Sequence, residues 1–173
     1  VADYDADGFP DIFVTNDKLP NFLFRNIKGK AFEETALLAG VALPADGKAI
    51  SSMGADFRDY DNDGWPDIHG TALNNETFPL FRNEGNGQFR DETFASRLGG
   101  LSLAWGGWST GMVDLDNDGF LDLFVAGATS RRTKSSTRAA PRASPIACSR
   151  TLATGPFGTS PARAAPTSSS SRR

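Results

Sequence analysis

The segment DYDADGFPDIFV, residues 3–14, occurs three times with small changes in this sequence of 173 residues. The other copies are DYDNDGWPDIHG at residues 59–70 and DLDNDGFLDLFV at residues 114–125, so the copies start 56 and 55 residues apart. A period of this length indicates a repeat architecture, in which each repeat is one supersecondary unit.

Short apolar runs accompany each copy. Residues 12–14, 22–24, 80–81 and 123–125 are rich in Phe, Ile, Leu and Val, and Phe32 and Phe89 stand alone. Gly, Asn, Asp and Pro bound these runs before a helix could complete two turns, and only residues 35–40 have helical character. We therefore predict an all-β chain with about four short strands per repeat, which is typical of the blades of a β-propeller.

Each copy begins with the pattern D-x-D-x-D-G-x-x-D, which places aspartates at positions 1, 3, 5 and 9 of a loop. Calcium takes six to eight oxygen ligands at about 2.3–2.6 Å. A tight loop can direct alternate side chains toward one ion if its sixth residue is a glycine that bends sharply. Position 7 would add a backbone carbonyl, so the pattern predicts calcium loops.

Two alternatives account less well for these loops. An EF-hand loop ends with a bidentate Glu at position 12, whereas that position here is Val14, Gly70 or Val125, each within an expected strand. Solvated turns also favour Asp, Asn and Gly. However, all twelve aspartates are kept in three copies at a nearly constant period, which favours metal binding.

Charge is distributed unevenly along the chain. All 21 acidic residues lie between Asp3 and Asp122, and residues 1–126 contain nine Lys and Arg, which gives this part a formal charge of −12. Bunched carboxylates imply a cation partner and argue against nucleic acid. No run of about 18 apolar residues occurs, so we expect no membrane span.

The sequence resembles the FG-GAP/VCBS repeat family over about residues 1–126. The Asp loops, L-F-R-N at residues 23–26 and 80–83, and the pattern G-x-F-x-D/E-x-T most resemble the branch with an ASPIC/UnbV domain, which includes cartilage acidic protein. The resemblance implies integrin-type calcium loops in a secreted or surface-exposed propeller of seven or eight blades. This chain holds about two repeats and the start of a third, so a closed ring would need further blades.

The resemblance also implies a ligand set for three calcium ions. The side-chain ligands would be Asp3, Asp5, Asp7 and Asp11 in the first loop, Asp59, Asp61, Asp63 and Asp67 in the second, and Asp114, Asp116, Asp118 and Asp122 in the third. Backbone carbonyls of Phe9, Trp65 and Phe120 would complete the three sites.

The residues favour a non-catalytic role as a scaffold for protein or glycan ligands, and the resemblance implies an extracellular, cell-surface or periplasmic location. The chain has one His, no Cys before residue 127, and neither G-x-S-x-G nor P-loop spacing. A glycosidase needs two carboxylates, but those of the loops are assigned to calcium, which keeps them ionised. The alternative is the non-catalytic part of a secreted propeller enzyme that acts on polysaccharide or another extracellular substrate.

Residues 127–173 form a low-complexity tail of Arg, Ala, Pro, Ser and Thr with nine basic and no acidic residues. Such a composition predicts disorder. GC-rich DNA that is translated in the wrong frame also gives a composition of this kind. In the frame offset by two bases, the genetic code permits NRLFQNLGDGTFRDVT from Pro145 to Ser160, which matches the next repeat, so we interpret the tail as an out-of-frame translation.

The frameshift interpretation predicts a one- or two-base insertion or deletion near codons 126–130. Sequencing the gene across these codons tests it. An intact frame whose bases encode no repeat sequence in the offset frame would refute the interpretation.

Overall fold

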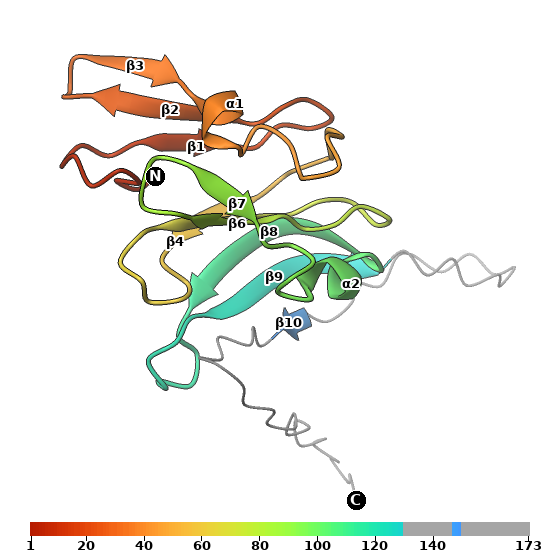
Figure 1. Cartoon of the computed structure of the whole chain (residues 1–173). Coiled ribbons are helices and arrows are strands. Elements are labelled where there is room, and N and C mark those ends of the chain that lie inside the picture. The colour runs from red at the N-terminus through yellow and green to blue at the C-terminus, as the bar shows by residue number, and fades with distance from the viewer. Residues whose placement is uncertain (130–146, 150–173) are drawn as a thin grey trace, which may run out of the picture.

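The computed structural model describes residues 1–129 and 147–149, which form three antiparallel sheets stacked one on another (Figure 1). The first sheet contains β1 (Ile12–Val14), β2 (Phe22–Ile27) and β3 (Ala31–Glu34). The second contains β4 (Ala55–Arg58), β5 (Asp67–Gly70), β6 (Leu80–Asn83) and β7 (Phe89–Asp91). The third contains β8 (Trp105–Val113), β9 (Asp122–Thr129) and β10 (Ala147–Ser149). The predicted all-β fold is confirmed.

One register recurs in the three sheets. Within each sheet, strands adjacent in sequence are hydrogen-bonded neighbours. The aspartate at position 9 of each loop pairs with the residue directly before that loop's first aspartate. The pairs are Ala2 with Asp11, Arg58 with Asp67, and Val113 with Asp122. Each Asp loop therefore closes a hairpin, as expected for a calcium loop between two strands.

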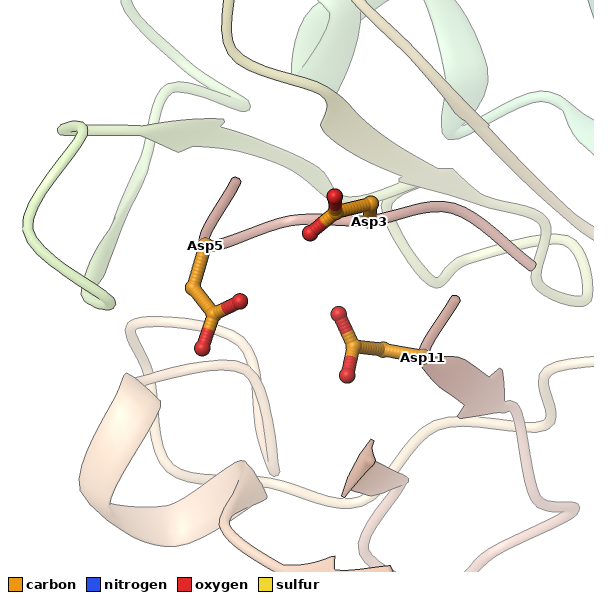
Figure 2. Close-up of side chains that lie close together, drawn as sticks. All are labelled: Asp3, Asp5 and Asp11. Atoms are coloured by element: carbon orange, nitrogen blue, oxygen red, sulfur yellow. The ribbon is translucent and has the colours of Figure 1, made fainter. Parts of the chain in front are cut away.

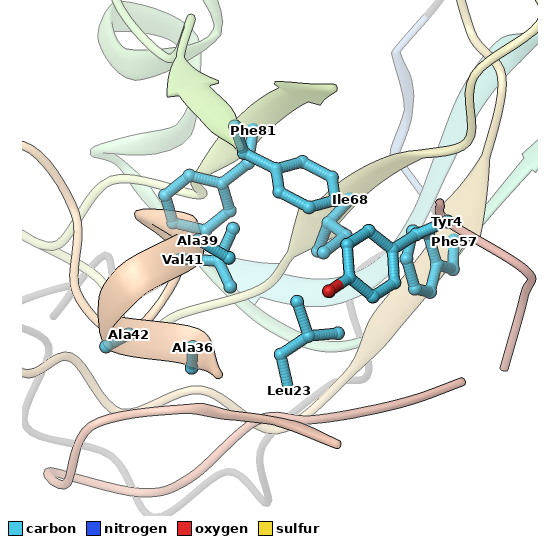
Figure 3. Close-up of a cluster of buried hydrophobic side chains, with 10 residues drawn as sticks. Tyr4, Leu23, Ala36, Ala39, Val41, Ala42, Phe57, Ile68 and Phe81 are labelled. Atoms are coloured by element: carbon cyan, nitrogen blue, oxygen red, sulfur yellow. The ribbon is translucent and has the colours of Figure 1, made fainter. Parts of the chain in front are cut away.

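Apolar side chains between the first and second sheets form the larger core (Figure 3). Leu23 on β2, Ile68 on β5 and Phe81 on β6 have no exposed surface, and Phe57 on β4 is nearly buried. Alternate residues of a strand point to opposite faces. Leu80, the neighbour of Phe81, accordingly belongs to the core on the other side of the second sheet.

The second core lies between the second and third sheets. It includes Leu80 and Phe78 from one side and Met112, Leu123 and Val125 from the other. Because the second sheet is apolar on both faces, it is sandwiched between its neighbours as a propeller blade is.

His69 occupies a strand position that holds Phe in the other two repeats. It lies in β5 with no exposed surface, and its Nδ1 is 2.9 Å from the hydroxyl oxygen of Thr110 on β8. Burial lowers the pKa of His69 to about 3, so the ring is neutral at ordinary pH. The residue thus joins the second and third sheets as a structural side chain.

Two short helices lie beside the sheets. α1 (Ala36–Ala39) falls inside the predicted segment and ends at Gly40, whose φ of 83° is the left-handed conformation that glycine adopts at helix ends. α2 (Leu98–Ser102) was not predicted, because its sequence LGGLS has low helix propensity. Burial of Leu98 in the second core offsets that low propensity.

The expected boundary at residue 126 falls inside β9, which continues to Thr129. β10 pairs with β9 in the same backbone register as β6 pairs with β5. Ser149 lies opposite Leu123, and Phe81 lies opposite Ile68, which is the residue equivalent to Leu123 in the second repeat. Residues 130–146 and 150–173 of the expected tail lie outside the described residues. Among the described residues, both helices are too short to span a membrane.

Candidate metal centres

The three Asp loops lie along one edge of the stack (Figure 1). Loop 1 (residues 3–11) precedes β1, loop 2 (residues 59–67) joins β4 to β5, and loop 3 (residues 114–122) joins β8 to β9. Loops 2 and 3 are in contact, because the side-chain amide of Asn62 donates a hydrogen bond of 3.1 Å to the carbonyl of Gly119.

The backbone of the three loops follows the same path. Positions 4 and 6 of each loop have positive φ angles, a conformation that glycine, and to a lesser degree Asn, adopts readily. At position 4 the angles are 57° for Ala6, 61° for Asn62 and 59° for Asn117. At position 6 they are 91° for Gly8, 92° for Gly64 and 87° for Gly119. The glycine required by the sequence pattern therefore has the predicted conformation.

The aspartate at position 1 organises this turn. In loop 1 the two carboxylate oxygens of Asp3 accept hydrogen bonds from the backbone N–H groups of Asp7 (3.1 Å) and Gly8 (2.9 Å). Asp59 and Asp114 accept the equivalent bonds in loops 2 and 3. The position-1 carboxylates are thus fixed by the backbone.

Carboxylates from positions 1, 3 and 9 converge in every loop. Figure 2 shows this arrangement for loop 1. In each cluster, one oxygen from each of the three aspartates lies within 4.8 Å of the others. The clusters are Asp3, Asp5 and Asp11; Asp59, Asp61 and Asp67; and Asp114, Asp116 and Asp122. The structure therefore brings together nine of the twelve predicted side-chain ligands.

The position-5 aspartates stand outside these clusters. One carboxylate oxygen of each accepts the backbone N–H of the residue at position 7, at 3.0 Å in every loop. The aspartates are Asp7, Asp63 and Asp118, and the donors are Phe9, Trp65 and Phe120. In this conformation, position 5 supports the turn that also carries the predicted carbonyl ligand.

The position-9 aspartates are the buried members of the clusters. Asp67 has no exposed surface, and its two oxygens accept the backbone N–H groups of Asn83 (2.7 Å) and Tyr60 (3.0 Å). Burial raises the pKa of Asp67 to about 7 despite these bonds, and it raises the pKa of Asp11 in loop 1 as well. A bound cation would favour the ionised form of both groups.

The Arg and Asn side chains of each L-F-R-N segment contact the Asp loops. These contacts were not predicted from the sequence. The side-chain amides of Asn26 and Asn83 donate to the carbonyls of Pro10 and Pro66 inside loops 1 and 2. Arg25 and Arg82 form ion pairs with loop aspartates. The L-F-R-N segment recurs in the sequence in register with the Asp loops, which is a signal of a shared role. Its contacts with the loops depend on how the hairpins pair, and the sequence does not show this.

The clustered side chains fit a hard divalent cation. All nine converging ligands are carboxylate oxygens, the donors that Ca²⁺ and Mg²⁺ prefer, whereas Zn²⁺ prefers His and Cys. Two oxygens bound to one calcium ion at about 2.3–2.6 Å can lie no more than about 5 Å apart. The 4.8 Å limit within each cluster satisfies this requirement.

Fold and loops together define a β-sheet repeat protein whose hairpins carry clusters of carboxylate oxygens. Two overlapping segments, residues 3–70 and 59–125, match the FG-GAP-like repeat, and together they span more than half of the chain. The chain therefore belongs to the FG-GAP-like repeat family. FG-GAP repeats generally form extracellular β-propeller binding domains. A comparison with curated proteins found no match.

Ala6 is the least suitable residue at position 4, because a left-handed conformation crowds its Cβ, while Asn tolerates it. We expect Ala6→Asn to raise the free energy of unfolding by about 0.5–1 kcal/mol. Denaturant unfolding in the absence of metal measures this change. The reverse substitution at the equivalent position, Asn117→Ala, should lower stability, and equal stability of all three proteins would contradict the prediction.

Cation binding to loop 2 should weaken in acid. Because Asp67 has a pKa of about 7 without metal, lowering the pH from about 8 to about 6 protonates a carboxylate that the cation requires ionised. We expect the affinity of this loop for calcium to fall about tenfold over that range. Calorimetric titration with calcium in two buffers of different ionisation enthalpy should also show that protons are released on binding near pH 6. A calcium affinity that does not change with pH would contradict the prediction.

Proposed function

We propose that this chain is part of an extracellular, calcium-binding β-propeller that serves as a scaffold for protein or glycan ligands, in adhesion or cell-surface assembly. Calcium is its cofactor, with one ion in each Asp loop. The observation that carries the proposal is the convergence of three carboxylates in each of three loops that share one backbone conformation.

The repetition of the clusters supports binding rather than solvation. An exposed turn needs no buried carboxylate, yet position 9 is buried in all three loops. Burying a charged group without a partner is costly, so a cation in the cluster offsets that cost. In loops 1 and 2, one oxygen of the position-9 carboxylate accepts a hydrogen bond from the loop and the other accepts one from the neighbouring strand. An ion bound to this carboxylate would therefore also hold the loop against its sheet.

Within the family, we assign the chain to the branch with an ASPIC/UnbV domain. The support is the combination of the Asp loops with L-F-R-N and with G-x-F-x-D/E-x-T. The roles of Arg and Asn in L-F-R-N, which contact the Asp loops, give this combination a structural reason. The proposed location is the cell surface, the periplasm or the extracellular space.

Further blades are part of the proposal. Ile68 and Phe81, on the face of the second sheet that meets the first sheet, are fully buried. Their equivalents in the first sheet, Ile12 and Phe24, lie opposite each other on its outer face, where Phe22 remains 42% exposed. An apolar face that repeats a buried one fits the packing of another blade.

The proposal gives the loop aspartates no catalytic role. A carboxylate that coordinates a cation stays ionised, which makes it a poor general acid. The loops instead stabilise the scaffold that displays the ligand-binding surface.

Calcium titration of the purified chain by calorimetry tests the proposal. We expect uptake of one ion per loop and a higher midpoint of thermal unfolding with calcium than with chelator. Asp59→Asn removes one carboxylate from loop 2 and should lower the number of bound ions by one. Asp46→Asn, an exposed aspartate outside the loops, is the matched control and should change nothing. Absence of calcium uptake at millimolar concentration would refute the proposal.

A further inference from the structure

An arginine of the neighbouring hairpin enters two of the Asp loops. In loop 1, Nε of Arg25 lies 2.6 Å from a carboxylate oxygen of Asp5 at position 3. In loop 2, Arg82 makes the same contact with Asp61 at 2.6 Å and adds a second, from Nη2 to the position-5 aspartate, Asp63, at 2.7 Å. The contacts recur because both arginines hold the third place of L-F-R-N.

Both ion pairs involve groups that belong to the proposed cation sites. Asp5 and Asp61 are members of the carboxylate clusters, so each guanidinium pairs with a carboxylate that a bound ion would also use. A guanidinium is permanently charged and repels a divalent cation close by. Each arginine therefore provides part of the counter-charge that the loop would otherwise obtain from calcium.

The arginines are not needed to hold the clustered carboxylates in place. In loop 2, Asp59 is fixed by two backbone N–H groups, Asp67 by two others, and Asp61 accepts the N–H of Asp63 at 3.3 Å. Removing Arg82 leaves these bonds intact. Its effect on cation binding should therefore come from its charge more than from orientation of the ligands.

Solvent reaches these pairs. The side chains of Arg25 and Arg82 are 42% and 32% exposed, and the pair of Arg25 with Asp5 lines a cleft of about 400 Å³ between the first and second sheets. A cation can thus approach while the arginine withdraws its side chain without unfolding the hairpin.

We propose that Arg25 and Arg82 are internal counter-ions of loops 1 and 2, which keep the loops folded when calcium is scarce and lower the affinity of the loops for calcium. This inference rests on the proposed function as a calcium-binding protein. The effect is larger in loop 2, because Arg82 pairs with two carboxylates and Arg25 with one. Through their charge, the arginines set the calcium concentration at which each blade becomes rigid.

Two measurements on the full chain test the proposal: calcium affinity by calorimetry, and the midpoint of thermal unfolding with chelator. Arg82→Gln should tighten calcium binding by about tenfold, the factor that Coulomb's law gives for a divalent ion roughly 6 Å from a unit charge in a water-like dielectric. It should also lower the unfolding midpoint without calcium. Arg25→Gln should shift both quantities in the same directions by less.

Two further variants separate charge from general disturbance. Arg90, on the strand next to Arg82, pairs with Glu84 and Glu92, so Arg90→Gln removes the same charge from the same sheet without a loop contact. It should change neither quantity appreciably. Arg82→Lys keeps the charge and should bind calcium nearly as the unmodified protein does.

The outcomes distinguish the two levels of inference. If the unmodified protein takes up no calcium, both the proposed function and the counter-ion role fail. If it binds calcium and Arg82→Gln binds with equal or lower affinity, only the counter-ion role is overturned. Should Arg82→Gln be unfolded without calcium, Arg25→Gln, which breaks one contact instead of two, decides the same question for loop 1.

Discussion

Mutual repulsion of carboxylates is the constraint on which this structure depends. Each loop places four aspartates within nine residues, and three of them bring oxygens within 4.8 Å of one another. Two unit charges at that separation repel by about 1 kcal/mol in a water-like medium and by about 3–4 kcal/mol near a protein surface. Backbone N–H groups and, in loops 1 and 2, an arginine offset part of this repulsion. A divalent cation is the counter-charge that the remaining geometry fits.

The loops are also joints between neighbouring sheets. Asn83, which binds Asp67 through its backbone, donates from its side chain to the carbonyl of Tyr4 in loop 1. Asn62 of loop 2 donates to Gly119 of loop 3. A cation that fixed one loop would therefore also fix a residue that is hydrogen-bonded to the loop of the neighbouring sheet. This coupling reinforces the two apolar cores, which already hold the second sheet between its neighbours.

Most of the strands and loops that recur in each repeat could be predicted from the sequence, because residues shared by the three copies stand out when the copies are compared. The Phe- and Ile-rich runs became β1, β2, β6 and β9, and the loop glycines have the expected positive φ. The long strand β8 was missed, since its sequence WGGWSTGMV is rich in glycine and forms a strand by pairing with β9. Spacing alone also could not show that Asp7, Asp63 and Asp118 stand outside the clusters, because that depends on how each side chain folds back on its own loop. Nor could it show that Arg82 enters loop 2, because that contact depends on the pairing of hairpins.

The most direct test of the account is the anomalous diffraction of crystals of this chain grown in calcium. The account predicts one calcium peak in each described loop, about 2.3–2.6 Å from carboxylate oxygens of positions 1, 3 and 9. The position-5 carboxylate should turn toward the ion as its hydrogen bond to position 7 gives way. Loops that keep the conformation described above at saturating calcium, with no peak between their aspartates, would contradict it.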